Sequence, residues 1–582
     1  MNNTPIRPAD CLKHYTLDQD KVCSPMETVN RFKARLKEVN LDILQEVRRI
    51  DNGRLDIPVY FSLCGKDAQM VIGNKKQMGK GSSPEQSQAS ACMELAERFS
   101  FFSFKQNEEN FITDTYANLK KSGQPLLPLV RLLLSVHDEN TDIATLERLI
   151  EDIPIQWTWA TNLNSGEVLL VPFSWFYAIN EFNGPSAGNT FEEAILQGIS
   201  ELVERHVCSL VNHHHLATPA IDPTSVTDPV ARELLDKFRT NNIELYLNDF
   251  TLDTGIPTVG ALAIDRSTFP ATSEIVYTAG TTPDPEKALI RAITEVAQLA
   301  GDFNSQANYV ASGLPKPLSM DEVRYLTETE TTISIHEMPQ LSDNNMRVEI
   351  DRCLAALSRL GLEVLVVNTM HEKLQVPAIY TIIPGCHFRE RSRINNVGLF
   401  AAKLVTERIC DADEQLVQLL KMQQHLPDAY FLEYYLGKNM QGQGDLASAV
   451  THLERALTLQ PEGEDIPYIY SHLGDCLKDM GEHDRAIDAL RKGMEHDEER
   501  PDIHNLLGFC HFKRDEYEVA IAHFHRAVEL NPASAIDYAN LGVNHRRLGN
   551  SAEAARYFEL ALDLDPGIEF ARTHLAELAA GD

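Results

Sequence analysis

The sequence has few of the features that send a chain into a membrane or out of the cell. No apolar run approaches the roughly 18 residues of a membrane span, because even "LLPLVRLLLSV" is short and is interrupted by Arg131. Residues 1–20 contain no apolar segment of the length that a signal peptide needs. The 10 cysteines are scattered, with no C-x-x-C pair and no zinc-like spacing. We therefore expect a cytoplasmic protein with reduced thiols and no association with membranes.

Basic residues are in the minority. The chain has 53 Lys and Arg against 85 Asp and Glu, which gives a formal net charge of -32. Direct binding to nucleic acid is not expected, because it draws most of its affinity from clustered Lys and Arg. The charge permits binding of divalent cations or of basic partners. A length of 582 residues with 43% hydrophobic content predicts several domains, or one large domain and a smaller one.

The standard nucleotide-binding motifs are also missing. The segment 73–82, "GNKKQMGKGS", has one residue too many before Gly79 for a P-loop, and Gly81 stands where Ser or Thr would follow Lys80. No dinucleotide-binding G-x-G-x-x-G and no kinase motif set appears. Two interpretations of Lys80 remain open, a contact to substrate or phosphate and a plain turn.

Residues 427–582 are self-similar. Gly437, Gly474, Gly508 and Gly542, each preceded by Leu, follow one another at steps of 37, 34 and 34 residues. Each unit has a small residue twelve positions after this Gly and another seven later, as two closely crossing helices require. The pattern resembles the tetratricopeptide repeat. We expect an all-α solenoid of about four repeats with a capping helix, "EFARTHLAELAA", preceded by a helical linker over residues 411–426.

Such a solenoid has two possible roles here. It can present a concave surface to a protein partner, or it can pack only against the rest of its own chain. The sequence does not decide between them.

The stretch 186–207, "SAGNTFEEAILQGISELVERHV", predicts a helix with an unusual polar stripe. Glu193, Gln197, Glu201 and Glu204 recur at steps of four and three residues, so they share one face. These carboxylates repel one another, and the stripe lacks the Lys at i+4 that surface helices tend to use. Two further helices carry similar stripes, namely Ser90, Glu94, Glu97 and Arg98 on the first, and Arg291, Glu295 and Gln298 on the second. For each helix alone, an ordinary solvent-facing stripe is the alternative.

Carboxylates that converge without lysines can be explained by a divalent metal ion. Mg²⁺ prefers hard oxygen ligands, usually a few carboxylates together with substrate phosphates. Arg supplies a forked donor that matches phosphate oxygens. Ser186 and Asn189 stand at a helix start, where an anion is favoured. The residues therefore predict a nucleoside triphosphate held through Mg²⁺.

Residues 1–410 combine helical patterns with short β-rich runs such as "EVLLVPFSW" and "LEVLVV", which predicts an α/β or α+β domain. Their motifs S-x3-E-x2-E-R, S-A-G-N-T-x2-E-A-x2-Q-G-x2-E-x2-E-R and R-x3-E-x2-Q resemble the YcaO family over about residues 15–410. The second match is long and ungapped. We expect an α+β YcaO-like catalytic domain over residues 1–410, followed by the linker and the tetratricopeptide-like module.

The resemblance implies a site for ATP and Mg²⁺. Carried over position by position, the metal ligands are Glu94, Glu97, Glu193, Glu201, Glu204 and Glu295. The nucleotide contacts are Ser90, Ser186, Asn189, Gln197, Arg205, Arg291 and Gln298. Lys21 and Thr28 correspond more loosely to a phosphate-contacting pair, and the alternative is that Lys21 is a solvated residue before a helix start.

The resemblance also implies a reaction, the phosphorylation of a backbone amide oxygen of a peptide. Azoline-forming members typically end in a proline-rich tail, whereas this sequence continues into the repeats and ends "LAELAAGD". We therefore expect thioamide formation or an accessory role in methylthiolation of a ribosomal protein, with a TfuA-like sulfur-delivery protein or a methylthiotransferase as partner. An azoline-forming cyclodehydratase and a catalytically silent adaptor remain the alternatives.

Overall fold

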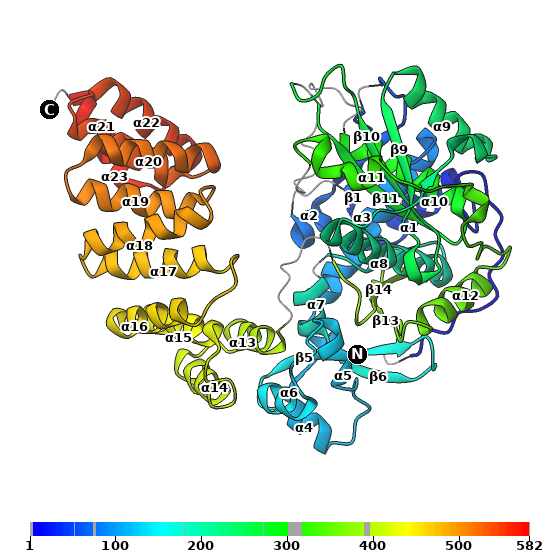
Figure 1. Ribbon diagram of the computed structural model, residues 1–582, viewed down its shortest axis with the longest axis horizontal. Helices are drawn as coiled ribbons and strands as arrows, with labels where there is room; N and C mark the ends of the chain where they lie inside the picture. Colours follow the sequence, from blue (N-terminus) through cyan, green and yellow to red (C-terminus); the bar gives the residue numbers. More distant parts are fainter. Residues whose placement is uncertain are drawn as a thin grey trace. The chain divides into compact units, whose positions relative to one another are not determined.

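The computed structural model describes residues 4–51, 53–73, 77–180, 182–271, 273–300, 317–388 and 396–580. The chain divides into two compact units (Figure 1). The first unit comprises Met1–Asn140 and Ile155–Arg393, and the second comprises Thr141–Pro154 and Ile394–Asp582. This division differs from the expected boundary at residue 410, because helix α13 (Val397–Arg408) groups with the helices that follow it. The expected boundaries at residues 410 and 426 stay predictions.

Strands of the first unit form three antiparallel or mixed sheets within the described residues. The first has the order β1-β2-β3, with β1 Leu44–Arg49, β2 Val59–Cys64 and β3 Gln77–Lys80. The second has the order β4-β5-β13-β14-β7, with β6 beside β5, and consists of β4 Ile112–Asp114, β5 Ile155–Asn162, β6 Val168–Pro172, β7 Pro185–Ala187, β13 Leu365–Asn368 and β14 Ala378–Ile382. The third has the order β11-β10-β9-β8-β12, with β8 Ala220–Ile221, β9 Glu244–Asp249, β10 Thr258–Ile264, β11 Val276–Thr281 and β12 Thr332–Ile333.

Helices surround these sheets. They are α1 Pro25–Val39, α2 Lys66–Ile72, α3 Pro84–Gln106, α4 Tyr116–Lys121, α5 Val130–Ser135, α7 Phe173–Asn180, α8 Phe191–His214, α9 Pro229–Thr240, α10 Pro285–Ala300, α11 Arg324–Thr327 and α12 Met346–Ser358. Helix α3 packs against β2, β3, β7 and β14, whereas α8 packs against β7, β14, β11 and α12. The long helices α3 and α8 therefore link the three sheets.

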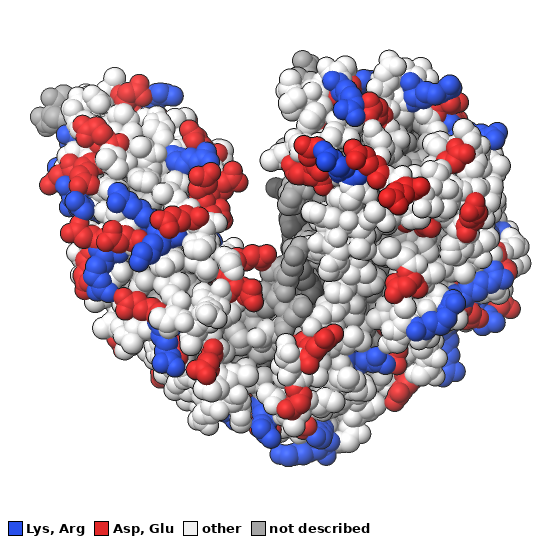
Figure 2. Space-filling model, viewed as in Figure 1, with Lys and Arg blue, Asp and Glu red and all other residues white. Residues whose placement is uncertain are grey.

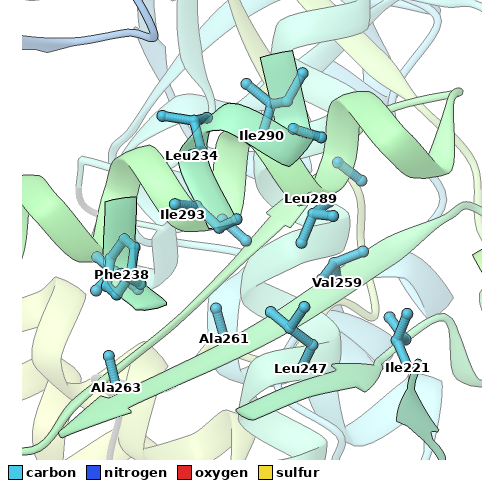
Figure 3. Packing of buried hydrophobic residues seen from close by; sticks show 14 of the residues in the cluster. Ile221, Leu234, Phe238, Leu247, Val259, Ala261, Ala263, Leu289, Ile290 and Ile293 are labelled. Carbon is cyan, nitrogen blue, oxygen red and sulfur yellow. The ribbon is translucent and has the colours of Figure 1, made fainter. Parts of the chain in front are cut away.

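A hydrophobic core joins the third sheet to α9 and α10 (Figure 3). Leu247 of β9 and Val259 and Ala261 of β10 face Phe238 of α9 and Ile293 of α10, and all five side chains are buried. Every residue of β10 is buried, as expected for a strand covered on both faces. The core fixes α10, and thereby the polar side of α10, relative to the sheet.

The second unit is all-α. It begins with α6 Ile143–Ile150, α13 and α14 Ala412–His425, which pack together. Pairs of antiparallel helices follow, namely α15 Tyr430–Gln443 with α16 Leu446–Thr458, α17 Ile466–Asp479 with α18 His483–His496, α19 Pro501–Lys513 with α20 Tyr517–Leu530, and α21 Ala535–Arg547 with α22 Ser551–Leu564, and the last is α23 Glu569–Ala580. The predicted run of consecutive helices is therefore present, and α14 occupies most of the expected linker.

The repeated glycines lie where paired helices cross. A Cβ atom on Gly508 of α19 would lie 2.8 Å from the ring of Phe524 on α20, and one on Gly542 of α21 would lie 2.7 Å from Phe558 on α22. A side chain at these positions would push the helices apart.

Among the described residues, none of the helices has the length and apolar content needed to cross a membrane.

Candidate nucleotide and metal site

Helices α3, α8 and α10 turn their polar stripes toward one cavity of the first unit. The cavity has a volume of about 1190 Å³, including space open to solvent. The predicted site residues that line it are Lys21, Thr28, Ser90, Glu94, Glu97, Asn189, Glu193, Gln197, Glu201, Glu204, Arg205, Arg291, Glu295 and Gln298. Stripes separated by up to about 200 residues of sequence therefore face each other in space.

The stripe of α8 is not an ordinary solvent-facing surface. Only 3% of Glu193 and 2% of Glu204 is exposed, and α8 is also buried along its apolar sides. The alternative of a solvated stripe is therefore wrong for this helix. A carboxylate withdrawn from water to this degree needs a cation or hydrogen-bond donors nearby.

Ser186 is the predicted site residue that the structure does not bring to the cavity. Its side chain is fully buried, and Oγ donates a hydrogen bond to the backbone oxygen of Ala194 at 2.9 Å. A Cβ atom on Gly198 would lie 2.9 Å from this Oγ, so Ser186 lies between β7 and the sheet-facing side of α8. In this position Ser186 holds the start of α8 against the sheet.

The start of α8 explains how Asn189 reaches the cavity. Thr190 caps the helix, because its Oγ1 accepts a hydrogen bond from the Glu193 amide at 3.2 Å. The Glu193 carboxylate accepts the Asn189 amide at 2.8 Å and the Val22 amide at 2.7 Å. The Asn189 side chain also donates to Thr28 Oγ1 at 3.1 Å. Glu193 therefore organises the N-terminal segment and the cap in addition to lining the cavity.

Arg291 connects α10 to α8. Its Nη1 donates to Gln197 Oε1 at 2.8 Å, and its Nε lies 3.3 Å from Glu204 Oε2. On α3, Arg98 lies 3.4 Å from Glu97 and donates to the backbone oxygen of Phe182 at 3.2 Å. Guanidinium groups fixed at the edge of a carboxylate cluster have the donor geometry that phosphate oxygens require.

Three carboxyl groups of this cavity are costly to keep ionised. Burial raises the pKa of Glu94 and of Glu201, and it raises the pKa of Glu97 well above its ordinary value. The nearby Arg98 and Arg205 only partly offset this effect. Carboxyl groups whose pKa is raised by burial favour a bound cation, because a cation removes the cost of keeping them ionised.

The donor set fits Mg²⁺ in company with a phosphate ligand. Within the described ranges, no three His, Cys, Asp or Glu side chains are grouped so that they would hold a metal ion by themselves. Mg²⁺ is commonly bound by one or two carboxylates with phosphates and water completing the shell. Glu94, Glu97 and Glu201, which have raised pKa values, are the residues best suited to that role.

Lys80 is a cavity residue for which the sequence left two interpretations open. It is the last residue of β3, it lines the cavity, and its ammonium group forms an ion pair with Glu295 of α10. Burial, together with Arg291, lowers the pKa of Lys80 to about 7. The plain-turn interpretation of Lys80 is therefore wrong. The sequence feature that could have indicated this position is the pair of glycines on either side of Lys80. Their role becomes clear only from the packing of β3.

A second, smaller cavity of about 560 Å³, including space open to solvent, adjoins the first and shares Lys21, Glu193, Gln197 and Arg291 with it. It is also lined by acidic side chains of the N-terminal segment and of α12, namely Asp18, Asp20 and Glu349. The buried Lys13 pairs with Asp20 at 2.6 Å and with Glu349 at 2.5 Å. Burial raises the pKa of Glu349 to about 7.

Comparison with protein-family models gives matches in both units. The model described as "YcaO cyclodehydratase, ATP- and Mg²⁺-binding" matches residues 78–387, more than half of the chain. A tetratricopeptide repeat model matches residues 499–566, and the model of subunit 3 of the anaphase-promoting complex matches residues 442–527.

Individual relatives cover the first unit. An uncharacterized protein of Methanothermobacter thermautotrophicus is 28% identical over 388 residues, which is 62% of this chain and 93% of that protein. An uncharacterized protein in the tfuA 3′ region of Rhizobium leguminosarum bv. trifolii is 24% identical over 411 residues, which is 66% of this chain and 93% of that protein. The solved structure of a heterocyclase in complex with substrate and cofactor has a TM-score of 0.52 at 23% identity and covers 66% of this chain and 55% of its own. This last likeness shows a shared fold.

Proposed function

Because the chain belongs to the YcaO family, we propose that its first unit is an ATP- and Mg²⁺-dependent enzyme that phosphorylates the oxygen of a peptide backbone amide. One observation carries the proposal most directly. Helices α3 and α8 bring carboxyl groups with burial-raised pKa values to one cavity, and helix α10 adds the guanidinium group of Arg291. That combination suits a metal-bound polyphosphate, and the family model is itself described as ATP- and Mg²⁺-binding.

The proposed roles follow from charge and position. Glu94, Glu97 and Glu201 would supply ligands to Mg²⁺ together with the phosphates of the nucleotide, and the buried setting strengthens their attraction to the ion. Arg205 and Arg291 receive phosphate oxygens. Further predicted ligands are Glu193, Glu204 and Glu295, whose oxygens already serve hydrogen bonds or ion pairs with Val22, Arg291 and Lys80.

When bound, ATP would supply the phosphoryl group that converts the amide oxygen into a leaving group, and Mg²⁺ would offset the negative charge of the phosphates. The chain's own groups position the reactants and stabilise the developing negative charge. No covalent protein nucleophile is needed for this reaction. The second cavity adjoins the first and shares Lys21 and Arg291 with it.

We further propose that the activated amide is converted to a thioamide. A relative lies in the tfuA 3′ region, which favours a sulfur-delivering partner of the TfuA type. An accessory role in methylthiolation of a ribosomal protein, azoline formation and a silent adaptor are the competing possibilities. The tetratricopeptide repeats of the second unit would recruit the protein substrate or that partner.

Nucleotide binding and turnover test the enzyme proposal. The purified full chain should bind a non-hydrolysable ATP analogue in the presence of Mg²⁺ and should hydrolyse or transfer the terminal phosphate of ATP. Glu201→Gln and Arg205→Ala should each reduce turnover by about 100-fold or more, as expected for lost electrostatic stabilisation. A wild-type chain without affinity for the analogue would contradict the proposal and favour the adaptor.

Mass spectrometry of a candidate peptide separates the reaction types. Exchange of one oxygen for sulfur supports thioamide formation. Loss of one water molecule indicates an azoline and would overturn the choice of product.

A further inference from the structure

Strand β3 brings Lys80 into the site because glycines flank it. A Cβ atom on Gly79 would lie 2.2 Å from the backbone oxygen of Ser87 on α3, and one on Gly81 would lie 2.6 Å from Cγ of Gln86. These approaches are too close for any side chain. The strand therefore packs directly on α3, and Lys80 extends into the cavity with only 18% of its side chain exposed.

The surroundings of Lys80 are unusual for a lysine. Its ammonium group forms an ion pair with Glu295, and Arg291, Arg205, Glu204 and Glu94 act on it electrostatically. Both arginines and both glutamates line the same cavity as Lys80, so its ammonium group lies among fixed charges of either sign. A cation held at such a place gains most from a ligand that brings more negative charge.

A metal-bound nucleotide would change the partners of Lys80. Glu295 is one of the predicted metal ligands, and a metal ion on that carboxylate would weaken its attraction to the ammonium group. The phosphates would enter the same cavity. Lysine is well suited to them, because its ammonium group acts as a compact charge with several donors.

We propose, as an extension of the function proposed above, that Lys80 contacts the terminal phosphates of the nucleotide and exchanges its partner Glu295 for them when the nucleotide binds. Before the nucleotide binds, Lys80 neutralises part of the charge of the carboxylate cluster. After the nucleotide binds, Lys80 neutralises part of the charge of its phosphates. The alternative is that Lys80 serves only as a counterion that keeps Glu295 in place. A double-mutant cycle separates the two roles.

Calorimetric titration of the full chain provides the test. Wild type, Lys80→Met, Glu295→Gln and the double variant are each titrated with a non-hydrolysable ATP analogue and with AMP, both in the presence of Mg²⁺. Lys80→Met should weaken binding of the analogue by about 10- to 100-fold, the effect of losing one hydrogen bond to a charged group. Binding of AMP should change less than threefold. Lys80→Arg should retain most of the affinity.

The decisive comparison is made in the Glu295→Gln background. If Lys80 contacts phosphate, Lys80→Met weakens binding of the analogue there as well. If Lys80 acts only through Glu295, the double variant binds like Glu295→Gln alone, and the inference is overturned. Equal loss for AMP and the ATP analogue would also overturn it.

Two controls keep the result interpretable. Lys66→Met removes an exposed lysine at the start of α2 and should leave all affinities unchanged. Thermal melts establish that each variant is folded, and Lys80→Gln replaces Lys80→Met if the latter is not. Absence of binding by wild type would contradict the proposed function itself, whereas normal wild-type binding with an unaffected Lys80→Met would contradict only the role of Lys80.

Discussion

Keeping certain glutamates of the first unit ionised costs free energy, and binding of a cation would explain why they are there. Burial raises the pKa of Glu97 well above its ordinary value, even though Arg98 lies 3.4 Å away. In a core designed only for stability, an apolar side chain would be preferable at this position. The cost becomes understandable if a cation binds there. The same reasoning applies to Lys80, whose positive charge is opposed by burial.

Replacement of Glu97 by Gln should stabilise the chain in a pH-dependent way. The raised pKa means that the folded state binds this proton more tightly than the unfolded chain. The contribution of this tighter proton binding to the free energy of unfolding is therefore fully present below about pH 4.5. It is lost as the pH rises through the pKa that Glu97 has in the folded state. Glu97→Gln removes this loss, so its stability relative to wild type should grow with pH, by about 1.4 kcal/mol for each unit by which the pKa is raised.

Urea unfolding of wild type and Glu97→Gln between pH 5 and pH 8 measures this difference. Glu109→Gln, which replaces an exposed glutamate just beyond α3, is the matched control and should give a constant difference. A variant that is less stable than wild type at pH 8 would show that the Glu97 carboxylate is stabilised in the folded chain without metal.

Among the elements, α8 carries more of the predicted site residues than any other described helix. Its cap at Thr190, its buried stripe and its contacts with two sheets place Asn189 and Glu201 in one cavity. The same helix holds the N-terminal segment, because Glu192 accepts the Ala9 amide at 2.8 Å and Glu193 accepts the Val22 amide. The start of α8 is therefore also the anchor of a segment that lines both cavities.

Glu193→Ala should loosen this segment. Loss of a hydrogen bond to a charged acceptor costs about 1.5 to 3 kcal/mol, so amide exchange near Val22 and Asn189 should become roughly 10- to 100-fold faster. Hydrogen–deuterium exchange measures the change, with amides of β10 as an internal reference because that strand is fully buried. Unchanged exchange near Val22 would show that Glu193 acts on the cavity alone.

The helix pairs of the second unit depend on their glycines. Gly508→Ala would place a methyl group 2.8 Å from Phe524, which should cost about 1 to 3 kcal/mol as an overpacked core. Gly463→Ala is the matched control, because a Cβ atom there has no neighbour within 4 Å. Chemical denaturation followed by far-ultraviolet circular dichroism compares the two variants. Equal midpoints would contradict a close helix crossing at Gly508.

At the scale of the whole molecule, the chain combines an enzyme-like unit with a repeat unit. Acidic side chains are spread over the visible face of both units, with basic side chains between them (Figure 2). The net charge of -32 weakens contact with nucleic acid and favours basic partners or metal ions. The cavity lies within the first unit, so the two units should respond differently to a nucleotide.

Differential scanning calorimetry should show this difference. An ATP analogue with Mg²⁺ at about 100 times its Kd should stabilise the transition of the first unit by about 2.7 kcal/mol and leave the transition of the repeats in place. Arg205→Ala should reduce the shift. A single transition that moves as a whole would show that the two units unfold together.

Much of this organisation could be predicted from residue patterns, because they reflect local geometry. The regular spacing of the Leu–Gly pairs in residues 427–582 predicted the run of helices, and the match to a tetratricopeptide repeat model confirms it. The Glu spacing predicted three polar stripes, and the YcaO family and the mixed α/β fold of the first unit are likewise confirmed. Individual contacts were less predictable. The pattern gave no sign that Ser186 would be fully buried beneath α8, since that depends on β7 and Gly198.

The repeats, the helix faces and the family follow from residue order alone, because periodicity and motif spacing are properties of one segment at a time. Three features came to light only in the folded chain: which stripes meet, the contact of Glu193 with the N-terminal segment, and the pairing of Lys80 with Glu295. The physical reason is that burial and ion pairing arise between segments far apart in the chain. A stripe of glutamates becomes a candidate metal site only when packing removes it from water and places guanidinium and ammonium groups beside it.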